Sequence, residues 1–179
     1  MGKLKEGYIQ IYTGNGKGKT TAAVGLATRA AGREYKVCMV QFLKTSCTGE
    51  LKSAEKLKPY FNIFRFESPK GFYWNLNDEQ KRTLKEEVQK AYEFCLEVLK
   101  NKEYDILIMD EIMGALKHDL VTEEQILHLM DVKPVNMELI MTGRNVPKSI
   151  FEKADLVTEM KDLKHYIDKG VVAREGIEY

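Results

Sequence analysis

The amino-acid sequence predicts one α/β domain over residues 1–179, with a mainly parallel sheet and helices on both of its faces. Short apolar runs alternate along the chain with segments of helical periodicity. The runs 36–43 and 104–109 are almost continuously apolar, as expected for strands that are covered on both faces. Glycine-rich or acidic residues follow several of these runs, at the strand ends where such sheets bind ligands.

Six apolar runs have the length and composition of strands. The run 36–43 reads Lys-Val-Cys-Met-Val-Gln-Phe-Leu, whereas the run 60–67 alternates large apolar and polar residues. The expected strands are 8–12, 36–43, 60–67, 104–109, 137–142 and 156–160.

Five helices are expected between these strands. The helix over 20–31 contains few helix breakers and ends before Gly32, a suitable residue for the C′ position. A short helix ends near Lys58, and another covers 147–154. The helix that extends to about Lys100 carries apolar residues at helical spacing, so one of its faces should pack on the sheet.

Two helix starts carry the signature of a capping box. Asn77 is followed three residues later by Gln80, and Thr122 is followed three residues later by Gln125. In this motif each side chain accepts a hydrogen bond from the other residue's backbone N–H group. The sequence therefore predicts that helices begin directly after Asn77 and Thr122.

Charge and cysteine content argue against several functional classes. The chain has 28 Lys and Arg against 27 Asp and Glu, so it lacks the basic footprint of a protein that binds nucleic acid or an anionic membrane. It has no apolar stretch typical of a signal peptide or a membrane span, and we expect a soluble, cytoplasmic protein. Cys38 and Cys95 are expected in the core and Cys47 in a polar loop, without disulfide or metal pairing.

The most specific motif is the glycine-rich segment 14–21, which lies between the first strand and an alanine-rich helix. Its glycines allow a turn whose backbone N–H groups point inward, and the helix start adds positive potential that suits phosphate groups. Lys19 supplies a mobile charge and the Thr20 hydroxyl a ligand for Mg²⁺. This arrangement predicts a P-loop NTPase fold of the RecA-like type. The expected nucleotide contacts are Gly14, Asn15, Gly16, Lys17, Gly18, Lys19, Thr20 and Thr21.

The glycine-rich segment departs from the standard P-loop spacing at one position. That spacing places a glycine five residues before Gly18, where this chain has Thr13. We expect Gly14 and Gly16 to supply the backbone freedom instead. The alternative is a glycine-rich turn that carries two solvated lysines.

The acidic pair Asp110 and Glu111 ends an apolar strand, which is the usual partner of a phosphate loop. Because Mg²⁺ needs only one or two protein carboxylates, Thr20 with either acid would suffice, and we favour Glu111 as the inner ligand. Mn²⁺ is an alternative metal. Arg144 lies in the turn after the fifth strand, where it reaches either a phosphate or ribose group or a surface acid.

These features indicate a nucleoside triphosphate and a metal, but they do not define a reaction. A kinase or ATPase that cleaves at the γ-phosphate fits them as well as a nucleotide switch does. Neither an arginine finger nor a catalytic base for phosphoryl transfer stands out.

From about residue 8 to residue 179 the chain resembles the corrinoid adenosyltransferases of the CobA/BtuR type. The phosphate loop with Thr13 in the first glycine position and the aromatic segment Gly71-Phe72-Tyr73-Trp74 are specific points of similarity. The sequence departs from the family at Thr45, where glycine is common, and over 112–119. The segments that carry the resemblance are 13–23, 40–44, 71–74, 110–111, 142–144, 154–159, 164–165, 170–171 and 176–179.

The resemblance implies transfer of the 5′-deoxyadenosyl group of ATP to the Co(I) of a reduced corrinoid, with release of triphosphate. Lys19 would then act on the leaving group. Phe72 and Trp74 would pack on the lower corrin face and exclude the axial ligand, which eases reduction of Co(II); the alternative is ordinary packing of these aromatic residues. A flavoprotein electron donor and a homodimer are further implications. A non-catalytic, nucleotide-gated corrinoid carrier remains a rival interpretation, beside a kinase or ATPase.

Overall fold

The computed structural model describes residues 4–44, 46–68, 71 and 73–179. They form one six-stranded sheet in the order β3-β2-β4-β5-β1-β6, and every strand pair in it is parallel. The strands are β1 (Ile9–Thr13), β2 (Val37–Gln41), β3 (Phe61–Phe64), β4 (Ile106–Asp110), β5 (Glu138–Thr142) and β6 (Leu156–Glu159).

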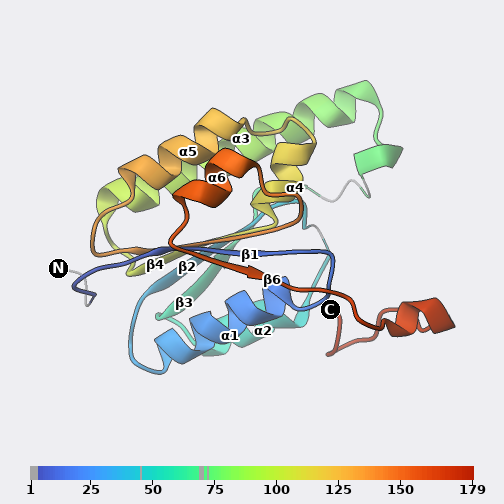
Figure 1. Ribbon diagram of the computed structural model, residues 1–179, viewed down its shortest axis with the longest axis horizontal. Coiled ribbons are helices and arrows are strands. Elements are labelled where there is room, and N and C mark those ends of the chain that lie inside the picture. Colours follow the sequence, from blue (N-terminus) through green and yellow to red (C-terminus); the bar gives the residue numbers. More distant parts are fainter. Residues whose placement is uncertain (1–3, 45, 69–70, 72) are drawn as a thin grey trace.

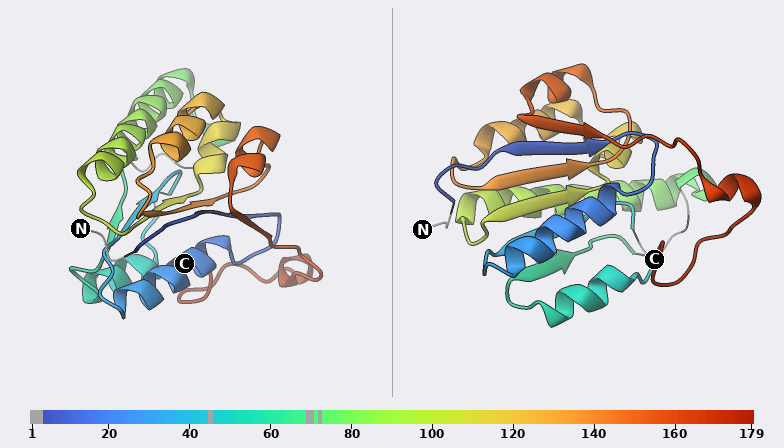
Figure 2. Two further views of the ribbon diagram at one scale, coloured as in Figure 1. Left: turned by 60° about the vertical axis from the view of Figure 1, so that its left-hand side comes forward. Right: turned by 60° about the horizontal axis from the view of Figure 1, so that its bottom comes forward.

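Helices cover both faces of this sheet, which confirms the predicted architecture (Figures 1 and 2). One face carries α1 (Lys19–Ala31) and α2 (Gly49–Lys56). The other face carries α3 (Asp78–Asn101), α4 (Ile112–Lys117), α5 (Glu123–Val132) and α6 (Lys148–Lys153). Two short 3₁₀ helices, η1 (Tyr73–Asn75) and η2 (Tyr166–Lys169), lie outside these layers.

The sheet separates two apolar cores, and β4 contributes to both because its side chains alternate between the faces. Leu107 and Met109 belong to the cluster that includes Val88 of α3. Ile106 and Ile108 belong to the cluster that includes Ala23 of α1. Strands buried in this way on both faces explain the almost continuous apolar runs. As predicted, two cysteines are buried and the third is exposed; they are Cys38, Cys95 and Cys47 respectively.

The second and third strands are shorter than the sequence predicts. Leu43 has a φ of 55°, a left-handed conformation that a strand does not adopt, so β2 ends at Gln41. The edge strand β3 pairs with β2, and the pairing ends at Val40 with Phe64. The predicted extension to residue 67 is therefore wrong, because β3 has no partner strand beyond that point.

The helix α1 ends before Gly32 as predicted, although the geometry of the cap differs, and one further helix was not expected. Gly32 caps α1 with a right-handed φ of −63°, and the left-handed residue of this turn is Glu34, with a φ of 63°. The helix α4, over residues that resemble the family only loosely, was not predicted. It begins after Glu111, whose φ of 62° turns the chain sharply away from β4. A six-residue helix is too short to show a periodicity in the sequence.

Both predicted capping boxes are present. The Asn77 side chain accepts a hydrogen bond from the Gln80 N–H group at 2.9 Å, and the Gln80 side chain accepts one from the Asn77 N–H group at 2.9 Å. Thr122 and Gln125 form the same reciprocal pair at the start of α5. These local motifs fix where α3 and α5 begin.

The parallel strands bring their carboxyl ends to one edge of the sheet. The glycine-rich segment follows β1, Asp110 ends β4, and Thr142 ends β5 before the turn that carries Arg144. Motifs far apart in the sequence therefore lie at the same edge, as the fold class predicts. Across the described residues, the helices are too short or too polar to cross a bilayer.

Candidate functional site

The glycine-rich segment forms a tight turn between β1 and α1. Gly14 has a φ of +96° and Gly18 a φ of +117°, conformations that residues with a Cβ rarely adopt. A Cβ on Gly14 would lie 2.3 Å from the carbonyl oxygen of Met160, so this position also excludes a side chain. The N–H group of Gly16 donates to the same oxygen at 2.8 Å. Gly14 thus supplies the conformational freedom predicted for the loop. Gly16 has no positive φ, and its role is close approach, since a Cβ there would lie 2.8 Å from the carbonyl oxygen of Met160.

Lys19 lies in the centre of this loop. Its ammonium group donates to the carbonyl oxygens of Gly14 at 2.7 Å and Gly16 at 2.9 Å, and only 9% of the residue is exposed. Burial, followed by the positive charge of Arg144, lowers the pKa of Lys19. Gly18 at the start of α1 makes no side-chain capping hydrogen bond, and the positive end of the helix dipole lies at this loop. The loop therefore concentrates positive potential, which suits a polyphosphate.

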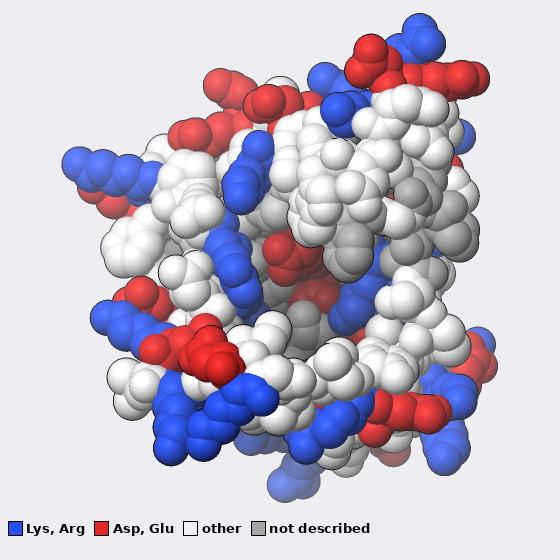
Figure 3. All heavy atoms as spheres, turned by 90° about the vertical axis from the view of Figure 1, so that its right-hand side faces the viewer, with Lys and Arg blue, Asp and Glu red and all other residues white. Residues whose placement is uncertain are grey.

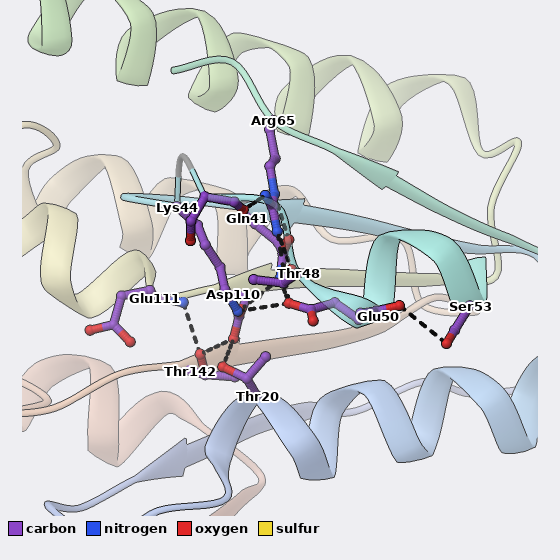
Figure 4. A network of polar contacts seen from close by, with 12 residues as sticks. Thr20, Gln41, Lys44, Thr48, Glu50, Ser53, Arg65, Asp110, Glu111 and Thr142 are labelled. Carbon is purple, nitrogen blue, oxygen red and sulfur yellow. Dashed lines mark hydrogen bonds and ion pairs between the residues drawn. The ribbon is translucent and has the colours of Figure 1, made fainter. Parts of the chain in front are cut away.

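Asp110 is the most buried charged group of the site, with 1% of it exposed. Its Oδ1 accepts hydrogen bonds from the hydroxyl groups of Thr20 at 2.9 Å and Thr142 at 2.8 Å. Its Oδ2 accepts from the Gln41 amide at 3.2 Å. Four elements (α1, β2, β4 and β5) thus meet at one carboxylate (Figure 4).

Glu111 takes a different direction from its neighbour. Its backbone N–H donates to Thr142 Oγ1 at 2.8 Å, while its side chain points away from Asp110 (Figure 4). Burial, followed by the charge of Asp110, raises the pKa of Glu111. The acid that contacts Thr20 is therefore Asp110, which makes Asp110 a better candidate for the inner metal ligand than Glu111, the acid favoured from the sequence.

A second layer of polar contacts holds Gln41 in place beside Asp110. Arg65 donates to Gln41 Oε1 at 2.8 Å and to Thr48 Oγ1 at 2.7 Å, and Gln41 donates to Glu50 at 3.1 Å. Lys44 forms an ion pair with Glu50 at 2.8 Å. Burial alone would raise the pKa of Glu50, but hydrogen bonds, that from Lys44 first, outweigh it and lower the pKa to about 2.

Two cavities open at the carboxyl edge of the sheet, where Figure 3 shows a hollow with acidic groups inside and basic groups beside it. The nucleotide cavity, as we name the larger, measures about 970 Å³ and is lined by the loop residues 15–21 and by parts of 162–179. The second cavity measures about 480 Å³ and is lined by Trp74, Glu111 and His118, among others. Lys19 and Arg144 line both cavities, so the two spaces adjoin.

The aromatic segment lies at the second cavity. Trp74 is 71% exposed, so it is not packed as an ordinary core residue. Tyr73 stacks on His118 with ring centroids 4.0 Å apart and an interplanar angle of 25°. His118 is half-buried, and burial lowers its pKa. Phe72 lies outside the described residues.

Sequence reasoning missed several residues of this site. Gln41, Thr142 and Arg65 are polar residues in or next to apolar strands, and Gln41 and Thr142 also lie in segments that resemble the family. These were the signals that the sequence offered. Lys17 was placed at the phosphates, but its ammonium group pairs with Glu178 at 2.8 Å, near the end of the chain. Nothing in the sequence indicates this contact, because 161 positions separate the two residues.

Comparisons with known proteins identify the family of the chain. The family model for the ATP:corrinoid adenosyltransferases BtuR/CobO/CobP matches residues 5–179. The corrinoid adenosyltransferase of Escherichia coli K12 is 34% identical over 176 residues, which cover 98% of this chain and 87% of that protein. The corrinoid adenosyltransferase of Pseudomonas aeruginosa is 32% identical over 181 residues, or 98% and 85% of the two chains.

Solved structures share the fold at lower identity. A KaiC-like protein of Pyrococcus horikoshii OT3 superimposes with a TM-score of 0.52 and 18% identity, over 87% of this chain and 74% of the other. The flagellar accessory protein FlaH of Methanocaldococcus jannaschii gives a TM-score of 0.52 and 17% identity, over 87% and 72%. These two support the P-loop architecture. With the family model matched over almost the whole chain, the protein belongs to the ATP:corrinoid adenosyltransferase family.

Proposed function

We propose that this protein transfers the 5′-deoxyadenosyl group of ATP to the cobalt of a reduced corrinoid and releases triphosphate. The observation that carries the proposal is the pair of adjoining cavities that share Lys19 and Arg144. One contains the phosphate loop, and the other presents the exposed ring of Trp74. Such a pair suits two large substrates that react where the cavities meet.

In this reaction the Co(I) electron pair attacks C5′ of the ribose, a cobalt–carbon bond forms, and the bond from C5′ to the triphosphate oxygen breaks. Co(I) is a strong nucleophile, so the protein needs to align the reactants and stabilise the leaving group. Alignment contributes up to about 7–11 kcal/mol in favourable cases. Backbone N–H groups of the loop, with Lys17 and Lys19, would stabilise the charge that grows on the triphosphate.

The residues at the loop fit a magnesium ion. The Thr20 hydroxyl and the Asp110 carboxylate lie 2.9 Å apart, and both supply the oxygen ligands that Mg²⁺ prefers. We therefore propose that Thr20 and Asp110 hold Mg²⁺, or Mn²⁺ in its place, with Glu111 close by. When bound, the metal would neutralise charge on the phosphate oxygens.

The corrinoid would occupy the second cavity, with Trp74 and Phe72 on its lower face. Exclusion of the lower axial ligand would lower the energy of the orbital that accepts the electron and so ease reduction of Co(II). A flavoprotein electron donor, a homodimer, a cytoplasmic location and action of residues 1–179 as a single domain belong to the same proposal. The electron donor and the homodimer rest on the family resemblance, whereas the location and the single domain rest on the apolar patterning and the length of the chain.

The test is product analysis with ATP, Mg²⁺, a strong reductant and, in separate assays, cobalamin, cobinamide and cobyrinic acid diamide. We expect intact triphosphate and a light-sensitive alkylcobalt product with at least one acceptor. Lys19→Ala should abolish turnover and leave the circular dichroism spectrum unchanged. ADP and inorganic phosphate without an alkylcobalt product would identify a kinase or ATPase instead. Corrinoid binding without any product would identify a carrier.

A further inference from the structure

The C-terminal segment, residues 160–179, returns to the phosphate loop after β6. The carbonyl oxygen of Met160 accepts a hydrogen bond from Gly16, and the chain then runs outward through η2 and back (Figures 1 and 2). At the far end, a Cβ on Gly49, where α2 begins, would lie 3.9 Å from the carbonyl oxygen of Tyr179. The segment thus spans from the loop to α2, and residues from both of its halves line the nucleotide cavity.

Glu178 holds this segment against the loop. Its carboxylate pairs with Lys17 at 2.8 Å and accepts hydrogen bonds from the Tyr166 hydroxyl and from the Arg174 side chain. The Arg174 N–H group also donates to it, at 2.8 Å. The Glu178 side chain is 17% exposed, against 40% for Lys17. Hydrogen bonds from Arg174, and then from Lys17, lower the pKa of Glu178.

The same segment exposes apolar side chains into the nucleotide cavity. Leu163 is 95% exposed, Ile167 63% and Ile177 57%, and all three line that cavity. Apolar side chains left open to water beside a binding loop mark a surface that a ligand covers. Polyphosphate has no apolar part, so phosphate binding by the loop does not explain these exposed apolar side chains. A nucleoside base can explain them, because its ring faces are flat and apolar.

We propose that the C-terminal segment is the wall of the nucleotide site that binds the nucleoside part of ATP, and that Glu178 is the positioning residue that holds it there through Lys17. This inference rests on the proposed function only in taking ATP as the ligand. Leu163, Ile167 and Ile177 contact the base, while the loop binds the phosphates.

The Glu178→Gln substitution has two effects on ATP binding that oppose each other, which makes this variant a sharp test. Removing a negative charge beside Lys17 raises the local positive potential, and this alone would strengthen binding of any polyanion. Loss of the ion pair frees the segment and removes the apolar wall. If Glu178 positions the segment, ATP binding weakens in spite of the added positive potential.

The experiment measures binding by calorimetry in the absence of corrinoid, with ATP and with inorganic tripolyphosphate as probes. We expect Glu178→Gln to weaken ATP binding about two- to fivefold, the upper range for a partly exposed ion pair, and tripolyphosphate to bind as before or more tightly. Ile177→Ser should weaken ATP alone. Glu175→Gln and Val172→Ser, on exposed residues of the same segment, are the matched controls and should leave both probes unchanged.

A kinetic readout separates positioning from general loss of structure. In Glu178→Gln the KM for ATP should rise while the KM for the corrinoid stays the same. Unchanged or tighter ATP binding in Glu178→Gln would overturn the proposal, as would equal weakening of ATP and tripolyphosphate. Because binding is measured without corrinoid, absence of an alkylcobalt product would count against the proposed function and leave this result standing.

Discussion

At the scale of single residues, Asp110 shows how the fold keeps a charge inside the protein. A buried carboxylate is unfavourable unless hydrogen bonds replace its lost hydration. Asp110 receives such bonds from Thr20, Thr142 and Gln41, each on a different element. Since Thr20 belongs to the phosphate loop, the carboxylate is fixed beside the expected position of the metal.

Asp110→Asn tests this residue. The substitution keeps the size and one acceptor oxygen but removes the negative charge, so we expect the Mg²⁺ concentration for half-maximal activity to rise at least about tenfold. Activity is followed by alkylcobalt formation during a Mg²⁺ titration, and thermal melting checks the fold. Glu111→Gln is the paired variant and should shift the titration much less. A larger shift of the Mg²⁺ titration in Glu111→Gln than in Asp110→Asn would instead support Glu111 as the inner ligand.

At the scale of elements, a capped helix start positions the aromatic segment. The capping box of Asn77 fixes the first turn of α3, and Leu76 just before it is buried. The Leu76 N–H group donates to the Tyr73 carbonyl oxygen at 3.2 Å, and Tyr73 stacks on His118 at the end of α4. With Tyr73 and Leu76 held in this way, Trp74 lies at the second cavity.

Trp74→Ala tests the role of this segment. If the indole excludes the lower axial ligand, the variant should lose most of its activity on Co(II) cobalamin with a weak reductant. Chemically prepared Co(I) bypasses that step, so its adenosylation should change far less. Both rates are measured from the absorbance of the alkylcobalt product, and Asn75→Ala serves as an exposed control on the same turn. Equal losses in the two assays would rule out ligand displacement.

Prediction from the sequence succeeded for elements whose signals are local. The capping pairs at Asn77 and Thr122 act within three residues, and the phosphate loop is continuous in the chain. It failed for α4, which begins after Glu111, a residue in the left-handed conformation, and which depends on burial of Ile112 and Met113. Burial of so short a helix is decided by the sheet beneath it, which no local pattern encodes.

At the scale of the whole molecule, the order of the strands brings two binding spaces together. The loop after β1 and the turn after β5 are adjacent because β1 and β5 pair in the sheet. Lys19 and Arg144 therefore face the same region, although 125 residues separate them, and both line the two cavities. Lys19 and Arg144 thus lie at the boundary between the two cavities, where a single side chain can contact both substrates.

Arg144→Ala tests that shared boundary. Because Arg144 lines both cavities, we expect the KM for ATP and the KM for the corrinoid to rise together, each by about two- to fivefold for loss of one exposed cationic contact. Lys17 lines only the nucleotide cavity of the two, so Lys17→Ala should affect ATP alone. Arg29→Ala, on the exposed side of α1, is the control. A rise in the KM for only one of the two substrates would show that Arg144 contacts that substrate alone.

The sequence by itself determined the parallel α/β architecture, the phosphate loop and the helix starts, because apolar periodicity, glycine conformation and capping act between residues close in the chain. Only the tertiary structure decided that Asp110 contacts Thr20 while Glu111 points away, that Gln41 and Thr142 join them, and that Glu178 meets Lys17. These contacts depend on strand order and on the path of the C-terminal segment. Strand order is set by burial of the whole sheet, and the path of the exposed C-terminal segment by its contacts with the loop through Met160 and Glu178. No short stretch of sequence specifies either.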